Sequence, residues 1–288
     1  MSPYKNIIEM EIWSSFGSFS KPFSNSGGIL TYLIPPKTAI IGMIGSVLGY
    51  EVNDYEEGEG GIRKYRIEEL YDVGVSIQPF FELVTKRVTF NSHYGGKKGS
   101  QLNAKHDVLV NPGYIIYLSF PEILSSQEKE FLESIKKKET VYNLYMGRNN
   151  FPLNYEFLNY FKSVDTETVE ESFRADKDHR LYGTLNRNII KNVRLTTLEQ
   201  KKKKKTVYRS NIKNQIERIA TQYDYLIKSY PIRRRNFTDF EYIPVSFFST
   251  KYSKKRFATD IYYSYFEVRA EGPICLYSIG DGRWITLI

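Results

Sequence analysis

Residues 16–51 read FGSFSKPFSNSGGILTYLIPPKTAIIGMIGSVLGYE, and this stretch decides the fold. It begins as a loop rich in Ser, Gly, Phe and Asn, followed by a short extended piece that ends at Pro35 and Pro36. The prolines and the sequence after them predict a helix over 37–48, and Gly49 suits its carboxyl-terminal cap.

Small residues mark one side of the predicted helix. Ala39, Gly42 and Gly45 recur at every third position, so this side carries little bulk. We expect it to pack closely against a sheet.

The patterns on either side of this helix follow a regular order. The sequence predicts strands at 4–13 and 70–78, a helix at 125–138 and a strand at 141–146. With the strand-like segments between the two helices, the order is strand, helix, strand, strand, helix, strand. That order is typical of a ferredoxin-like or RRM-like βαββαβ unit. We therefore expect an α+β protein with this unit over 1–155.

A protruding arm is predicted inside this unit. Residues 81–90 and 108–120 are both strand-like, and NSHYGGKKGSQLNAKHD lies between them. This pattern predicts a two-stranded hairpin over about 81–118 with a glycine- and lysine-rich tip.

The second half of the chain has a different character. Residues 156–288 are expected to form a variable β-rich region with one helix at about 212–229. Residues 1–150 carry 16 basic and 17 acidic residues, whereas 151–288 carry 25 and 16, so the excess positive charge is local. The Lys201–Lys205 run is expected to be a solvated loop.

Composition favours an anionic partner. Across 288 residues, 41 Lys and Arg oppose 33 Asp and Glu, a net charge of +8, and Tyr, Phe and Trp together number 44. Cations neutralise phosphates and aromatic rings stack on bases, so this pairing suits single-stranded nucleic acid. The alternative is an ordinary aromatic core in a basic protein.

Several protein classes are disfavoured. A single cysteine, Cys275, forms no internal disulfide. No apolar run reaches the roughly 20 residues of a membrane helix, and the amino terminus has no secretory pattern. We expect a cytoplasmic protein that makes no membrane contact.

The chemistry of metals and nucleotides has no signature in this sequence. The three histidines are scattered, and the sequence has no CxxC, HExxH, GxGxxG or phosphate-loop motif. We expect neither a metal nor a cofactor. RNA cleavage without a metal needs a base for the 2′-hydroxyl proton and a cation for the developing charge, and Lys105 with His106 is the adjacent pair that suits it. The alternative is a surface pair that contacts phosphate or nothing.

Three segments resemble one protein family. FGSFSKPFSNSGGILTYLIPPKTAIIGMIGSVLGYE at 16–51 resembles the opening of the Cas-five family of CRISPR-associated RAMP proteins. QLNAKHDVLVNPGYIIYL at 101–118 is similar to that family's strand after its hairpin arm, and LYMGRNNFPL at 144–153 to its glycine-containing segment. The three occur in the expected order.

The resemblance implies a noncatalytic subunit of a type I Cascade complex, of subtype I-B or I-A, acting in antiviral defence. Such a subunit has a ferredoxin-like RAMP core with a β-hairpin thumb and caps the 5′ handle of the CRISPR RNA (crRNA). Its partners would be the first Cas-seven backbone subunit and the large subunit, and target DNA only indirectly. In most such systems a separate Cas-six enzyme cuts the precursor RNA.

One branch of the family is itself a metal-independent endoribonuclease that processes CRISPR repeat RNA. It uses a tyrosine near the end of the corresponding helix, together with a Lys-His pair. Leu48 stands where that tyrosine would be, which argues against catalysis. Tyr50 lies two residues away, so Lys105, His106 and Tyr50 form the alternative catalytic set.

Charge, stacking capacity and the resemblance together indicate the RNA-binding residues. In the first loop, Phe19 or Phe23 would stack on a base or anchor the loop, and helix amides beside Lys37 would favour a phosphate. Asn103 would be a polar reader on the arm, and Arg148 would grip a phosphate with both nitrogens or pair with a carboxylate instead. The full predicted set is Lys21, Phe23, Asn25, Ser26, Lys37, Lys86, Arg87, Lys97, Lys98, Gln101, Lys105, His106 and Arg148.

Overall fold

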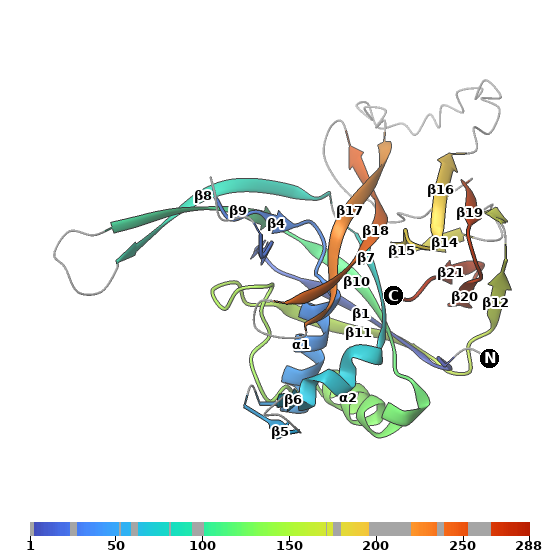
Figure 1. Ribbon diagram of the computed structural model, residues 1–288, viewed down its shortest axis with the longest axis horizontal. Helices are drawn as coiled ribbons and strands as arrows, with labels where there is room; N and C mark the ends of the chain where they lie inside the picture. The colour runs from blue at the N-terminus through green and yellow to red at the C-terminus, as the bar shows by residue number, and fades with distance from the viewer. Residues whose placement is uncertain are drawn as a thin grey trace, which may run out of the picture.

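The computed structural model describes residues 3–23, 28–51, 53–58, 63–80, 82–93, 101–170, 172–174, 180–195, 220–234, 239–252 and 266–288. Four predicted site residues, Asn25, Ser26, Lys97 and Lys98, lie outside these ranges, as does the Lys201–Lys205 run. The described protein is a mixed α and β structure, rich in strands, with two α-helices (Figure 1).

A four-stranded antiparallel sheet forms the centre of the molecule. Its order is β11-β1-β10-β7, from strands β1 (Ile7–Trp13), β7 (Gly74–Pro79), β10 (Gly113–Ser119) and β11 (Asn154–Phe161). Its central pair is held in register from Ile8 opposite Leu118 to Trp13 opposite Gly113. Successive side chains point to opposite sides of this sheet, so each of its two faces can bury a layer.

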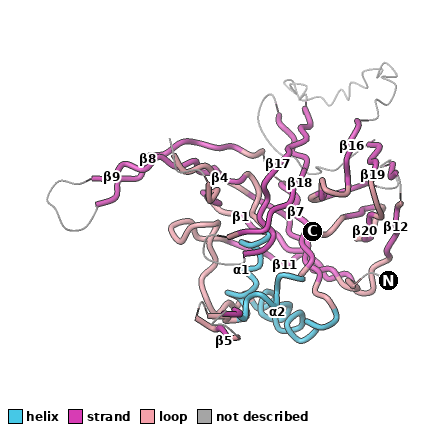
Figure 2. Tube along the Cα trace, viewed as in Figure 1, coloured by secondary structure: helices cyan, strands magenta, loops and turns pink. Residues whose placement is uncertain are grey.

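The helices α1 (Lys37–Leu48) and α2 (Ser125–Lys137) cover one face of the sheet, beside one another in Figures 1 and 2. Ile8, Met10 and Ile12 of β1 share a core with α1 and α2. The α1 bounds match the predicted 37–48, and Gly49 ends the helix in the left-handed conformation with φ 75°, as expected of its cap.

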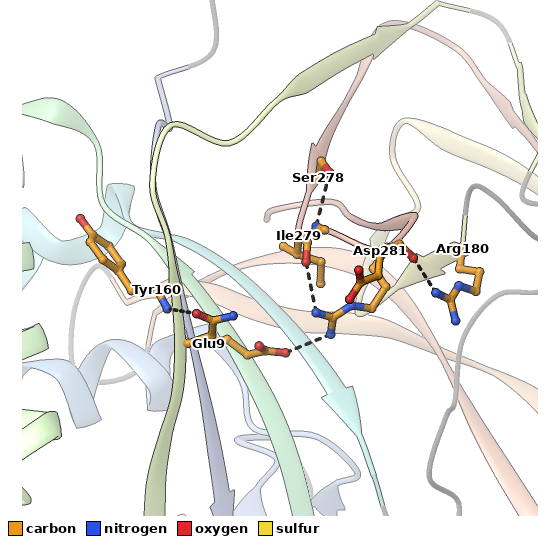
Figure 3. Close-up of polar contacts among 9 residues, drawn as sticks. Glu9, Tyr160, Arg180, Ser278, Ile279 and Asp281 are labelled. Atoms are coloured by element: carbon orange, nitrogen blue, oxygen red, sulfur yellow. Dashed lines mark hydrogen bonds and ion pairs between the residues drawn. The ribbon is translucent and has the colours of Figure 1, made fainter.

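The other face of the sheet packs on strands from the end of the chain. Ile7 and Tyr117 share a core with Ile279 and Ile285. Within this layer Arg283 reaches the buried Glu9 carboxylate, with 3.5 Å between Nη1 and Oε1, and donates from Nη2 to the carbonyl of Ile279 (Figure 3). Burial raises the pKa of Glu9, and the Arg283 cation opposes that shift.

The last strand of this sheet is not where the sequence placed it. The predicted strand at 141–146 is irregular backbone whose Leu144 and Met146 fill the core, and β11 provides the pairing instead. Apolar content at 141–146 reflects burial in a loop, not strand formation. The expected boundary at 155 falls inside β11.

The arm is a hairpin of β8 (Val84–His93) and β9 (Gln101–Val110), and it extends far from the sheet (Figure 1). The predicted return strand at 108–120 was wrong in one respect. The predicted segment is not one strand. It contains the end of β9 and the separate strand β10, and the chain turns between them at Asn111, which has φ 48°. The short strand β2 (Phe16–Gly17) pairs with the base of β9.

The helix predicted at 212–229 was wrong over its described part. Residues from 220 onward form β17 (Ala220–Arg234), which pairs with β18 (Phe240–Tyr252). Burial alternates along it, with Tyr225 and Ile227 packed on the core while Leu226 is exposed. Burial thus repeats every second residue, as in a strand, and not with the period of the predicted helix.

The remaining elements are short. They are β3 (Phe19–Ser20), β4 (Thr31–Tyr32), β5 (Tyr55–Glu57), β6 (Arg63–Tyr65), η2 (Arg66–Asp72), η3 (Glu122–Leu124), β12 (Thr166–Val169), β13 (Ser172–Arg174), β14 (Arg180–Tyr182), β15 (Leu185–Asn186), β16 (Ile190–Leu195), β19 (Phe266–Ala270), β20 (Ile274–Ser278) and β21 (Arg283–Ile285). None of the described helices is long and apolar enough to cross a membrane.

Candidate nucleic-acid interface

The first loop lies along the base of the arm. The Ile29 amide donates to the Lys105 carbonyl over 2.8 Å, and the Asp107 amide donates to the Ile29 carbonyl over 2.9 Å. Gly28, at φ 132°, makes this approach possible, because a Cβ there would stand 3.0 Å from the Lys105 carbonyl oxygen. The loop that carries Lys21 and the strand that carries Lys105 therefore belong to one surface.

Arg148 and His106 meet at this surface. Arg148 Nη1 lies 2.7 Å from His106 Nδ1. Phe90 packs its ring edge-on against His106 at 5.0 Å, and the Arg148 guanidinium lies 5.6 Å from the centre of that same ring. Arg148 was expected to grip a phosphate or, as the alternative, to pair with a carboxylate, and its side-chain partner within the protein is instead an imidazole.

The contact fixes the protonation of His106. A guanidinium has only donors, so Nδ1 of His106 accepts the hydrogen bond and the imidazole is neutral with its proton on Nε2. Burial and the adjacent Arg148 cation both lower the pKa of His106. The ring is thus held neutral and offers no free lone pair.

Gly147 sets the position of Arg148. It has φ 88°, and a Cβ there would stand 2.2 Å from the carbonyl oxygen of Ser18. The Ser18 amide donates to the Met146 carbonyl over 3.0 Å, which ties the Arg148 segment to the first loop. The segments around Ser18, His106 and Arg148 therefore converge although they lie far apart in the sequence.

The basic residues of the arm divide between its two faces. Directly opposed residues share a face, so Lys86 and His106 lie on one face and Arg87 and Lys105 on the other. Asn103 belongs by register to the second face. The side chain of Gln101 lies outside the described part of the structure. The basic residues predicted on the arm therefore do not form one continuous strip.

The exposed cations of the arm also differ in their pairing. Arg87 Nε donates to Asp107 Oδ1 over 2.9 Å, so its charge is already balanced. Lys86 and Lys105 are exposed. Among the described residues of the arm, those two lysines are best placed to meet a phosphate.

The phenylalanines of the first loop have separate roles. Phe19 is buried in the core, whereas Phe23 is 60% exposed and touches Tyr242 edge-on at 6.3 Å. Phe19 therefore anchors the loop, and Phe23 is available to stack. Lys21 lies 5.4 Å from the ring centre of Tyr32, which is itself buried.

Lys37 does not meet the solvent. It is 6% exposed, and its Nζ donates to the carbonyl of Ile288 over 2.9 Å. Burial lowers its pKa to about 8. The predicted phosphate contact is wrong for this residue, because its ammonium is used inside the protein.

A cleft of about 610 Å³ lies over the outer side of α1. Tyr50 lines it, and the guanidinium of Arg66 lies 4.2 Å from the Tyr50 ring centre. Neither Lys105 nor His106 is among the residues that line this cleft. The structure thus does not gather the alternative catalytic set into one pocket.

This cleft also corrects the prediction for the small residues of α1. Ala39, Gly42 and Gly45 line the cleft, and Gly42 is exposed with nothing within 4 Å of a Cβ built on it. No pattern in the sequence indicated the cleft, because its walls include Tyr71 and Phe240, which are far from α1 in sequence. Within the described ranges, no three His, Cys, Asp or Glu residues gather to hold a metal.

Comparison with known proteins gives one family match and distant structural similarities. Residues 7–78 match the family model of a CRISPR-associated protein (Cas_Cas5). No curated protein matches the chain. A chain of a CRISPR RNA-guided surveillance complex is 11% identical with a TM-score of 0.39, over 51% of this chain and 60% of that one. A CRISPR protein from Archaeoglobus fulgidus is 12% identical with a TM-score of 0.41, over 98% of each chain.

Proposed function

Since residues 7–78 make this chain a member of the CRISPR-associated Cas-five family, we propose that it is a noncatalytic crRNA-binding subunit of a Cascade-type surveillance complex. It caps the 5′ handle of the crRNA and contacts the first Cas-seven backbone subunit and the large subunit. Its four-stranded sheet with α1 and α2 is the ferredoxin-like RAMP core, its arm is the thumb, and its subtype is I-B or I-A.

The joining of the first loop to the arm is the observation that carries this proposal. The backbone of Ile29 hydrogen-bonds to Lys105 and Asp107, the two neighbours of His106 in β9. The loop with Lys21 and the exposed Phe23 therefore lies beside the part of the arm that carries Lys105. Ammonium groups pair with phosphates and an exposed ring stacks on a base, which are the two contacts that single-stranded RNA needs.

The state of His106 supports a noncatalytic role. A general base needs a free lone pair near the 2′-hydroxyl, but Nδ1 of His106 is occupied by Arg148 and Nε2 carries the proton. Tyr50 lines a cleft that excludes this histidine, and Leu48 has no proton to exchange. His106 instead holds Arg148 in place.

The test is to incubate the full-length protein with end-labelled CRISPR repeat RNA in EDTA, beside a His106→Ala variant. We expect RNA binding without cleavage for both proteins, with binding weakened in a Lys105→Ala variant. Specific cleavage that disappears in His106→Ala would contradict the proposal and establish the metal-independent endoribonuclease. Reconstitution with the Cas-seven and large subunits would then test the partners.

A further inference from the structure

The cleft over α1 has a floor of small residues and aromatic walls. Thr38, Ala39, Gly42, Gly45 and Ser46 of α1 form the floor. Six aromatic residues line the walls. Tyr50, Tyr65 and Phe240 are half-buried and can meet a ligand, whereas Phe19, Tyr32 and Tyr71 are buried. At about 610 Å³ it lies within the range of pockets that bind small ligands.

Gly42 shows that the space above the floor is left open. A glycine inside a helix is less stable than alanine, so a packing reason is usually found for it. Gly45 has such a reason, because a Cβ there would stand 2.4 Å from Cδ1 of Ile67. Gly42 has none, since nothing lies within 4 Å of its Cβ position. Its missing side chain leaves room in the cleft that no protein atom fills.

The polar groups of the cleft suit a nucleobase. Glu51 and Glu68 line it, and Glu68 uses Oε1 to accept from the Tyr65 amide over 3.1 Å. Carboxylate oxygens accept hydrogen bonds from the amino groups of bases. Aromatic side chains stack on unpaired bases that are turned out of a strand. The carboxylates and aromatic side chains of the cleft therefore suit the chemistry of a nucleobase.

The cleft is continuous with the proposed RNA surface. Ser20 and Pro22, on either side of Lys21, line it, and so does Gly147, which precedes Arg148. A strand held at these cations would pass the mouth of the cleft. We propose that the cleft binds one unstacked base of the crRNA handle, an inference that rests on the function proposed above.

The test measures RNA affinity of the full-length protein by fluorescence anisotropy, using CRISPR repeat RNAs in which one nucleotide at a time is abasic. We expect a single abasic position to weaken binding about tenfold, because a stacked base contributes on that order. In a Gly42→Phe variant the added ring fills the cleft. That variant should bind the intact RNA about tenfold more weakly and lose its sensitivity to that abasic position.

Ile123→Phe is the matched control, because it places the same ring at an exposed position of η3 that does not line the cleft. It should bind every RNA as the wild-type protein does. If melting shows that Gly42→Phe does not fold, Gly42→Leu replaces it, and the abasic series on the wild-type protein still decides.

The outcomes separate this inference from the proposed function. Wild-type binding with no sensitive position, or a Gly42→Phe variant that keeps the sensitivity, overturns the base pocket and leaves the RNA-binding role intact. A wild-type protein that binds none of these RNAs overturns both.

Discussion

Gly147 shows how one residue can assemble a surface from distant segments. With φ 88° and Ser18 against it, this position accepts no side chain without strain. The turn it makes directs Arg148 to His106 and fixes the imidazole as neutral. A backbone conformation at one residue therefore determines the charge state of another that lies far away in sequence.

We predict opposite stability changes for alanine at two glycines. Gly147→Ala should lower the free energy of unfolding by about 2 kcal/mol or more, because the Cβ meets a backbone carbonyl at a positive φ. Gly42→Ala should raise it by about 0.5–1 kcal/mol, because the helix gains propensity and nothing is displaced. Urea unfolding measures both changes. Equal changes at the two sites would contradict the conclusion that Gly147 is sterically restricted and Gly42 is not.

We predict that His106 makes the protein less stable in mild acid. Its pKa is lowered in the folded state, so the unfolded chain takes up a proton first as the pH falls below about 6.5. The free energy of unfolding should therefore fall on acidification from that point until the pH reaches the folded-state pKa. A His106→Asn variant, whose oxygen can accept from Arg148, should lose less stability between about pH 7.5 and 5.5, a window around the ordinary histidine pKa. An equal fall in the free energy of unfolding over this pH range in both proteins would refute this prediction.

Single residues were predicted unevenly from the sequence, for physical reasons. The loop motif indicated Lys21 and Phe23, of which Phe23 is exposed and Lys21 is half-buried. Lys37 followed the rule for helix amino termini, but its ammonium is buried against the carbonyl of Ile288. Arg148 was predicted to bind a phosphate because its guanidinium offers two parallel donors. Its partner His106 lies far away in sequence, so only the fold shows the contact. Composition reports what a side chain can bind, whereas the partner depends on the fold.

At the scale of elements, the arm is a two-faced ribbon. Its continuous register from Val84 opposite Val110 to His93 opposite Gln101 assigns every residue to one face or the other. One face carries Lys86 between the exposed Val84 and Val88, and the other carries Lys105. A strand of RNA that follows one face leaves the other available to a protein neighbour.

We predict that salt dependence will identify the RNA-binding face. If RNA lies against the face of Lys105, Lys105→Ala should reduce the slope of log affinity against log salt by about 0.7, the value for one single-strand phosphate. Lys86→Ala should then leave the slope unchanged. Arg87→Ala is the control on the same face as Lys105, because its charge is already balanced by Asp107. Equal effects from all three variants would show that charge, not position, controls binding.

Elements with a strong local signal were predicted well, and those decided by tertiary packing were not. The prolines and the terminal glycine bounded α1, and α2 also lies where its pattern placed it. The segment at 220–229 was read as a helix, yet it is a strand because its partner β18 and the α1 surface bury alternate residues. The segment at 141–146 is apolar because it fills the core as a loop.

At the scale of the whole molecule, tyrosine hydroxyls connect the two halves of the chain. Tyr230 of β17 donates to the Pro35 carbonyl over 2.8 Å, and Tyr32 donates in the other direction to the Ser229 carbonyl over 2.8 Å. Tyr71 adds a bond of 3.0 Å to the Arg234 carbonyl. Part of the high tyrosine content is therefore structural, which the composition did not distinguish from RNA binding.

We predict that Tyr230→Phe lowers the free energy of unfolding by about 1–2 kcal/mol. The ring remains buried, so the loss is the hydrogen bond and the buried Pro35 carbonyl left without that donor. Tyr142→Phe, at an exposed tyrosine, is the control and should leave stability unchanged within about 0.5 kcal/mol. Denaturant unfolding of both variants measures this, and equal values would disprove the connection.

The arm has one more consequence, which concerns solubility. Strand order β2-β9-β8 makes β8 the outermost strand of its sheet, so the side of β8 that faces away from β9 can accept a further strand by backbone pairing. Lys86 and Arg87 lie in the first half of this strand, between Val84 and Val88, and charged side chains there discourage identical arms from adding to one another. The positive charges of β8 thus protect the free protein from edge-to-edge aggregation, whatever they bind once the protein is assembled.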